Sequence, residues 1–122
     1  MSKTVLVVDD SSTVRQQVSM ALTQAGFATK EAADGQEGLE SIDAGSVDMV
    51  ICDVNMPRMN GLEMVEAVKA KPQNKALPIV MLTTEGQPAM IKRAKEAGAS
   101  GWIVKPFDAS QLVAAAQKLT GA

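Results

Sequence analysis

The sequence predicts an α/β protein in which five parallel strands form one sheet covered by helices on both faces. Two observations carry this prediction: short apolar runs alternate strictly with segments of helical periodicity, and there are five of each. Several runs contain no polar residue, which is typical of strands buried on both sides. Strict alternation of strand and helix favours a doubly wound sheet with right-handed crossovers.

The predicted elements follow one another along the whole chain. Strands are predicted at residues 5–8, 28–32, 49–52, 79–82 and 102–104. Apolar residues at helical spacing run through residues 14–25, 36–44, 62–68, 90–97 and 112–119. Ser11 begins a start signal for the first helix, Gly26 ends that helix, and Pro78 introduces the fourth strand. The segment 28–32 is partly polar and is the weakest strand pattern.

Composition indicates one domain, residues 1–122. A chain of 122 residues with 46% hydrophobic content can bury a core without a disulfide or structural metal. Its 12 basic and 14 acidic residues give a formal charge of −2, so there is no basic excess for nucleic acid. A mixed surface of this kind suits protein partners.

Residue usage points to the cytoplasm. Cys52 is the single cysteine and cannot form an internal disulfide, and residues 1–3 do not begin a signal peptide. No stretch approaches the roughly 20 apolar residues of a membrane span. The chain has no histidine, which excludes histidine metal sites, histidine general bases and a phosphohistidine carrier.

Charged side chains follow three of the predicted strands. Asp9 and Asp10 follow the first, Asp53 follows the third, and Lys105 follows the fifth. Parallel strands of an open α/β sheet place their carboxyl ends, and their ligands, at one edge. Three carboxylates gathered there would repel one another unless a cation lay between them, and Mg²⁺ prefers such oxygen ligands. The pattern predicts a magnesium site.

The same edge has the groups that phosphoryl transfer requires. Asp53 is a candidate nucleophile, because a carboxylate can accept a phosphoryl group as an acyl phosphate. Lys105 supplies a positive charge and Thr83, after the fourth strand, a hydroxyl donor for the phosphoryl oxygens. Each residue alone could be ordinary turn, cap or surface chemistry. The four strand ends together favour the functional interpretation.

At these residues the chain resembles the receiver domain of two-component response regulators over its full length. The matching segments are Val8-Asp9-Asp10-Ser11, Asp53-Val54-Asn55-Met56-Pro57, Asn60-Gly61, Thr83-Thr84-Glu85 and Trp102-Ile103-Val104-Lys105-Pro106-Phe107. The resemblance implies a flavodoxin-like sheet of order 2-1-3-4-5. It also implies a cis peptide bond between Lys105 and Pro106.

The resemblance implies a role for each site residue. A histidine kinase would phosphorylate Asp53, and Mg²⁺ would be held by Asp10, Asp53 and the Asn55 backbone carbonyl, with Asp9 reaching the ion through water. Thr83 and Lys105 would bind the phosphoryl oxygens. Asn55 and Glu85 would flank the attacking water and tune self-dephosphorylation. The protein would assist its own phosphorylation without being a turnover enzyme.

Within the family, the chain is similar to single-domain chemotaxis regulators of the CheY type. The segment that follows Phe107 forms one helix, so the signal is expected to leave by docking, as a monomer, to a flagellar motor switch protein or a phosphatase. Thr83 and Trp102 would form the switch. Trp102 stands where chemotaxis members often have tyrosine, and it offers no phenolic hydroxyl.

Other functions use similar residues or the same sheet order. A phosphate sink or a phosphorelay intermediate would use the same chemistry. A dehalogenase-type phosphatase also has a strand-end aspartate, but it needs an acid two residues later, where this chain has Asn55. A flavodoxin-like carrier shares the sheet order, but Asp9 and Asp10 would repel a flavin phosphate.

Overall fold

The computed structural model describes residues 3–54, 56, 59–84 and 88–121. Its five parallel strands lie in the order β2-β1-β3-β4-β5, which confirms the predicted topology. The elements are β1 (Thr4–Val8), α1 (Ser12–Gln24), β2 (Ala28–Ala32), α2 (Gly35–Asp43), β3 (Met49–Asp53), α3 (Gly61–Lys69), the 3₁₀ turn η1 (Pro72–Asn74), β4 (Ile79–Thr83), α4 (Pro88–Ala97), β5 (Gly101–Val104) and α5 (Ala109–Thr120). The sequence pattern did not predict η1.

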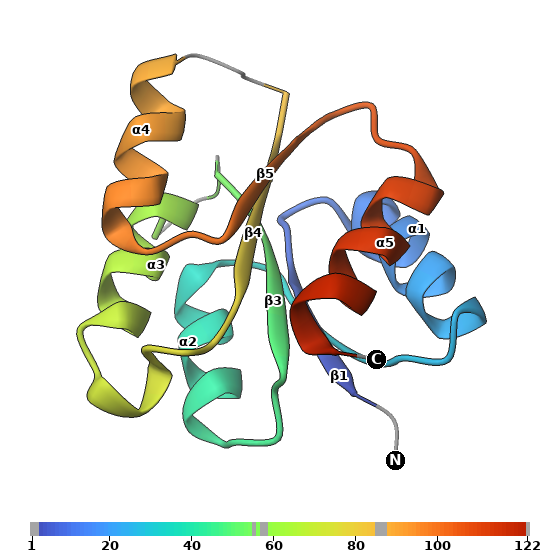
Figure 1. Cartoon of the computed structure of the whole chain (residues 1–122), viewed down its shortest axis with the longest axis horizontal. Coiled ribbons are helices and arrows are strands. Elements are labelled where there is room, and N and C mark those ends of the chain that lie inside the picture. Colours follow the sequence, from blue (N-terminus) through green and yellow to red (C-terminus); the bar gives the residue numbers. More distant parts are fainter. Residues whose placement is uncertain (1–2, 55, 57–58, 85–87, 122) are drawn as a thin grey trace.

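Helices cover both faces of the sheet. Helices α1 and α5 lie on one face, and α2, α3 and α4 lie on the other (Figure 1). The strands divide their side chains between the two layers because successive residues of a strand point to opposite faces. In β1, Leu6 and Val8 pack in the α2–α4 layer, whereas Val5 and Val7 pack in the α1–α5 layer.

The same alternation holds in the neighbouring strands. In β3, Cys52 belongs to the α2–α4 layer and Ile51 to the α1–α5 layer. In β5, Ile103 packs in the α1–α5 layer and Trp102 packs against the α2–α4 layer. The layer that each strand-end side chain faces is therefore set by its place in this alternation.

Polar caps begin the helices near the sheet edge. The Ser11 hydroxyl accepts a hydrogen bond from the Val14 backbone N–H at the start of α1. At the start of α3, Asn60 and Glu63 form a reciprocal capping box. Gly26, with φ +98°, follows the end of α1, as the sequence predicts.

Among the described residues, no helix has the length and apolar character needed to cross a membrane.

Gly61, the first residue of α3, packs directly against the end of β3. Its N–H donates to the Val54 carbonyl oxygen at 2.8 Å. A Cβ at this position would overlap the Asp53 carbonyl oxygen and lie 3.0 Å from the Met81 methyl carbon. This close contact restrains the backbone of Asp53, and a residue with a Cβ does not fit at position 61.

We expect Gly61→Ala to lower the free energy of unfolding by about 1–3 kcal/mol, the usual cost of overpacking a close contact. Urea denaturation followed by circular dichroism measures this loss. Gly101→Ala is the control, because a Cβ there would meet Val80 at an ordinary 3.7 Å. Equal stability of the two variants would contradict the packing argument.

Candidate functional site

Strand register brings the predicted site residues to one edge of the sheet. Val8 pairs with Cys52, so Asp9 and Asp10 follow β1 beside Asp53, the last residue of β3. Thr83 ends β4, and Lys105 follows β5. All these positions are at the carboxyl ends of parallel strands, where the sequence placed them.

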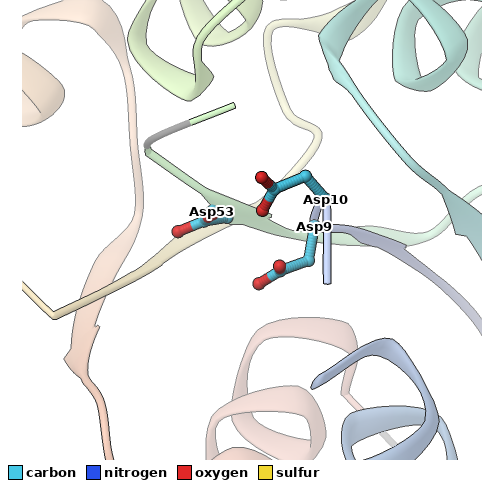
Figure 2. Close-up of side chains that lie close together, drawn as sticks. All are labelled: Asp9, Asp10 and Asp53. Carbon is cyan, nitrogen blue, oxygen red and sulfur yellow. The ribbon is translucent and has the colours of Figure 1, made fainter. Parts of the chain in front are cut away.

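The three aspartates form a compact carboxylate cluster. One carboxylate oxygen from each of Asp9, Asp10 and Asp53 lies within 4.8 Å of the others. Figure 2 shows the Asp9 and Asp10 side chains leaving the end of β1 on opposite sides, with the Asp53 side chain beside them. Asp9 and Asp53 are buried, whereas Asp10 is exposed to solvent. Two carboxylates of the cluster are therefore buried, and the third, that of Asp10, lies at its solvent-exposed side.

Lys105 contacts both buried carboxylates. Its Nζ lies 3.0 Å from Asp9 Oδ2 and 3.5 Å from Asp53 Oδ1. The Lys105 side chain is itself only 17% exposed. A buried charge without an opposite charge nearby is strongly disfavoured, so the short distances between the Lys105 ammonium and the two carboxylates are important for all three groups. The two carboxylates raise the pKa of Lys105 and outweigh the effect of burial, so the ammonium stays charged.

Asp9 is held by bonds to its backbone as well as its side chain. Its N–H donates to the Ala32 carbonyl oxygen at 3.1 Å, and its Oδ1 accepts from the Ser11 N–H at 2.9 Å. Arg15 Nη1 donates to the Asp9 carbonyl oxygen at 2.6 Å. The sequence did not predict this role of Arg15, because nothing in the residue pattern indicates which group an arginine near the start of a helix will contact.

Burial raises the pKa of the Asp53 carboxyl from 3.8 to about 6. Repulsion from Asp9 adds to this increase, and the Lys105 ammonium opposes it. The neighbouring Cys52 thiol has its pKa raised by burial and by the charges of Asp53 and Asp9. This thiol is therefore not a reactive nucleophile, whereas Asp53 is ionised at neutral pH.

Thr83 and Trp102 face the same side of the sheet. Trp102 pairs in register with Met81, and Thr83, two residues farther along β4, pairs with Val104. The Trp102 ring is partly buried against the α2–α4 layer, and its indole nitrogen is enclosed with no hydrogen-bond partner among the described residues. The two residues of the predicted switch are thus diagonal neighbours on adjacent strands.

One further prediction is confirmed, and another falls on residues that the structure does not describe. The Lys105–Pro106 peptide bond is cis, as the resemblance implied. Asn55 and Glu85, expected as a backbone ligand and as modulators of dephosphorylation, lie outside the described residues.

The donor set fits a small divalent cation. Oxygen ligands from three carboxylates converge, and among the described residues the exposed Asp10 carboxylate has no hydrogen-bond or ion-pair partner. Lys105 contributes one positive charge against three negative charges. Mg²⁺ typically binds through one or two carboxylates and retains several waters, which suits a cluster open at Asp10.

Comparison with known proteins shows the family of the chain. The model of the response regulator receiver domain family matches residues 5–117. The chain is 39% identical over 116 residues to a chemotaxis protein CheY of Pseudomonas aeruginosa, covering 94% of each. It is 41% identical over 109 residues to a chemotaxis protein CheY-3 of Vibrio cholerae, covering 88% of this chain and 84% of the relative.

Solved structures show the same arrangement of the whole chain. Chemotaxis protein CheY4 of Vibrio cholerae superposes with a TM-score of 0.92 at 44% identity, covering 98% of this chain and 99% of the other. A putative response regulator from Chloroflexus aurantiacus superposes with a TM-score of 0.93 at 34% identity, covering both chains completely. The flavodoxin-like fold of the chain is thereby established.

The raised pKa of Asp53 predicts a pH-dependent cost to folding. Folded Asp53 binds its proton more tightly than unfolded Asp53, so stability falls as the pH rises from about 4 to about 6, and the cost is complete above that range. In metal-free buffer at pH 7.5, Asp53→Asn should be more stable than the natural protein by at most about 3 kcal/mol, the free energy that corresponds to raising the pKa of the carboxyl from 3.8 to about 6.

Denaturant unfolding of both proteins between pH 4 and pH 7.5 measures this difference. The advantage of Asp53→Asn should shrink toward pH 4, where the natural carboxyl is protonated in the folded state. A variant less stable than the natural protein at pH 7.5 would show that the contact with Lys105 outweighs the burial of the charge.

Proposed function

Because this chain belongs to the response regulator receiver family, we propose that it is a chemotaxis regulator switched by phosphorylation of Asp53. The proposal rests on the cluster of three carboxylates, in which Lys105 contacts the two buried ones, Asp9 and Asp53. In this proposal the arrangement would supply a nucleophile, a cation site and a positive charge at one edge of the sheet. The chemotaxis assignment is supported by the similarity to CheY proteins.

Asp10 and Asp53 would hold Mg²⁺ directly, with the Asn55 carbonyl as a third protein ligand and Asp9 acting through water. The ion would supply charge neutralisation for the incoming phosphoryl oxygens. Asp9 is the carboxylate least available as a direct ligand, because Ser11 and Lys105 already occupy its two oxygens. Asp10, exposed at the opening of the cluster, is the most available.

Phosphoryl transfer would occur at the Asp53 carboxylate. One Asp53 oxygen attacks the phosphorus of the kinase phosphohistidine, the new P–O bond forms, and the P–N bond breaks, returning its electron pair to the imidazole. Lys105 already contacts Asp53, so a small movement of its ammonium reaches a phosphoryl oxygen on that residue. The Thr83 hydroxyl would donate to a second phosphoryl oxygen.

The new group would change the surface that partners bind. Phosphorylation adds about 1.5 to 2 negative charges and strong acceptor oxygens. Drawn toward them, Thr83 would move away from the space beside Trp102, its diagonal neighbour on the same side of the sheet. Trp102 would then adopt a different packing and alter the face formed by α4, β5 and α5. A near-complete shift between states requires roughly 5.5 kcal/mol, so the ion, Thr83 and Lys105 must act together.

The proposed partners follow from this role. A chemotaxis-type histidine kinase would supply the phosphoryl group, and a flagellar motor switch protein or a phosphatase would bind the phosphorylated form. The protein would act in the cytoplasm as a monomer. The proposal includes no turnover of a substrate, and Asn55 and Glu85 would set the lifetime of the aspartyl phosphate.

Incubation with acetyl phosphate tests the chemistry. Intact mass spectrometry should show one phosphoryl addition that requires Mg²⁺, with acetate as the leaving group. Asp53→Asn should show none. Asp43→Asn, which removes an exposed carboxylate on α2, should be phosphorylated like the natural protein. An intact fold without phosphoryl addition, or addition that persists in Asp53→Asn, would contradict the proposal.

The coupling to Trp102 has its own test. On phosphorylation, the natural protein should change its Trp102 fluorescence, whereas Thr83→Ala should gain the phosphoryl mass and lose most of this change. Thr84→Ala is the matched control, because it removes the adjacent, exposed hydroxyl and should respond normally. A full fluorescence change in Thr83→Ala would show that the switch does not pass through Thr83.

A further inference from the structure

Arg15 forms a bridge between the end of β1 and the end of β2. Its Nη1 donates to the Asp9 carbonyl oxygen at 2.6 Å, and its Nε lies 3.2 Å from Glu31 Oε1. The Arg15 side chain is only 18% exposed, while that of Glu31 is 42% exposed. Arg15 belongs to α1, Glu31 to β2 and Asp9 to the loop after β1, so one guanidinium joins three parts of the fold.

The carbonyl that Arg15 binds belongs to the peptide group between Asp9 and Asp10. A peptide group is planar, so fixing its oxygen also fixes the orientation of the Asp10 nitrogen and the direction in which the Asp10 chain departs. The Asp9 N–H is held by Ala32 and the Asp9 Oδ1 by the Ser11 N–H. Arg15 adds a third restraint, on the Asp9 carbonyl oxygen, which belongs to the peptide group that leads to Asp10.

Asp10 needs such external support. Its carboxylate is exposed and has no hydrogen-bond or ion-pair partner among the described residues, in contrast to Asp9, whose two oxygens are both bonded. The direction of the Asp10 side chain is therefore controlled through its backbone. A charged donor on a carbonyl is stronger than a neutral one, and the planar guanidinium keeps Nε for Glu31 while Nη1 reaches Asp9.

We infer that Arg15, oriented by Glu31, is a positioning residue that sets the Asp10 carboxylate for divalent cation binding. The inference rests on the proposed function, since it concerns the cation site of the same cluster. It predicts that loss of the bridge weakens cation affinity while Asp53 remains competent as the acceptor. Removing groups that orient metal ligands typically costs about 10–100-fold in affinity.

The experiment is a titration with MgCl₂ followed by backbone amide chemical shifts. Arg15→Ala should bind Mg²⁺ about tenfold more weakly than the natural protein, near the low end of that range because Arg15 acts through the backbone. Glu31→Gln, which keeps an acceptor but removes the charge, should show a smaller weakening. Arg93→Ala is the matched control: it removes an Arg–Glu contact of 3.3 Å, to Glu66, between α4 and α3, and should leave Mg²⁺ affinity unchanged.

A second readout separates positioning from a general structural role. With acetyl phosphate, the Mg²⁺ concentration for half-maximal phosphorylation of Arg15→Ala should rise with its dissociation constant, while the rate at saturating Mg²⁺ stays near that of the natural protein. If Arg15→Ala does not fold, Glu31→Gln decides, because its exposed side chain is replaced by one of equal size.

The outcomes separate the two proposals. Natural affinity in Arg15→Ala and in Glu31→Gln would overturn this inference and leave the proposed function standing. A rate that fails to recover at saturating Mg²⁺ would also overturn it, since the defect would lie in phosphoryl transfer. Absence of Mg²⁺ binding by the natural protein would overturn both.

Discussion

The contact of Lys105 with Asp9 and Asp53 is the interaction on which the arrangement of the site depends. Two carboxylates buried at adjacent strand ends repel each other, and burial alone disfavours their charges. Lys105 lies 3.0 Å from one and 3.5 Å from the other, and it comes from the far end of the chain. It therefore links the ends of β1 and β3 to the segment after β5. Under the proposed function, the same ammonium would then be in place for a phosphoryl group on Asp53.

The alternation of side chains along the strands determines which residues can take part in this contact. Cys52 packs in the α2–α4 layer, so the next residue, Asp53, faces the α1–α5 layer. Ile103 packs in the α1–α5 layer. Because successive side chains alternate, Lys105, two residues later, faces the same layer, and Trp102, one residue earlier, faces the opposite one. Thr83 shares the Trp102 side. The fold thus separates the buried charges from the proposed switch pair, and phosphorylation of Asp53 would connect them through the strand edge.

The sequence predicted the sheet order through a family resemblance, and predicted the strands themselves from apolar runs such as residues 49–52 and 79–82. It also placed Asp9, Asp10, Asp53, Thr83 and Lys105 at one edge, because parallel strands share that edge. It did not predict that Lys105 contacts Asp9 more closely than Asp53, which depends on side-chain reach across the completed sheet. Nor did it find Arg15, whose target is a backbone carbonyl and leaves no pattern in the residue types.

Titration of the Asp53 carboxyl carbon by ¹³C NMR, in metal-free buffer, measures how far Lys105 offsets the burial of this carboxylate when the natural protein is compared with Lys105→Met. Methionine retains an unbranched side chain but removes the positive charge. The pKa of Asp53 should be about 6 in the natural protein and higher in Lys105→Met, because the Lys105 ammonium stabilises the carboxylate against burial and against repulsion from Asp9. An ordinary pKa near 3.8 in both proteins would contradict this expectation.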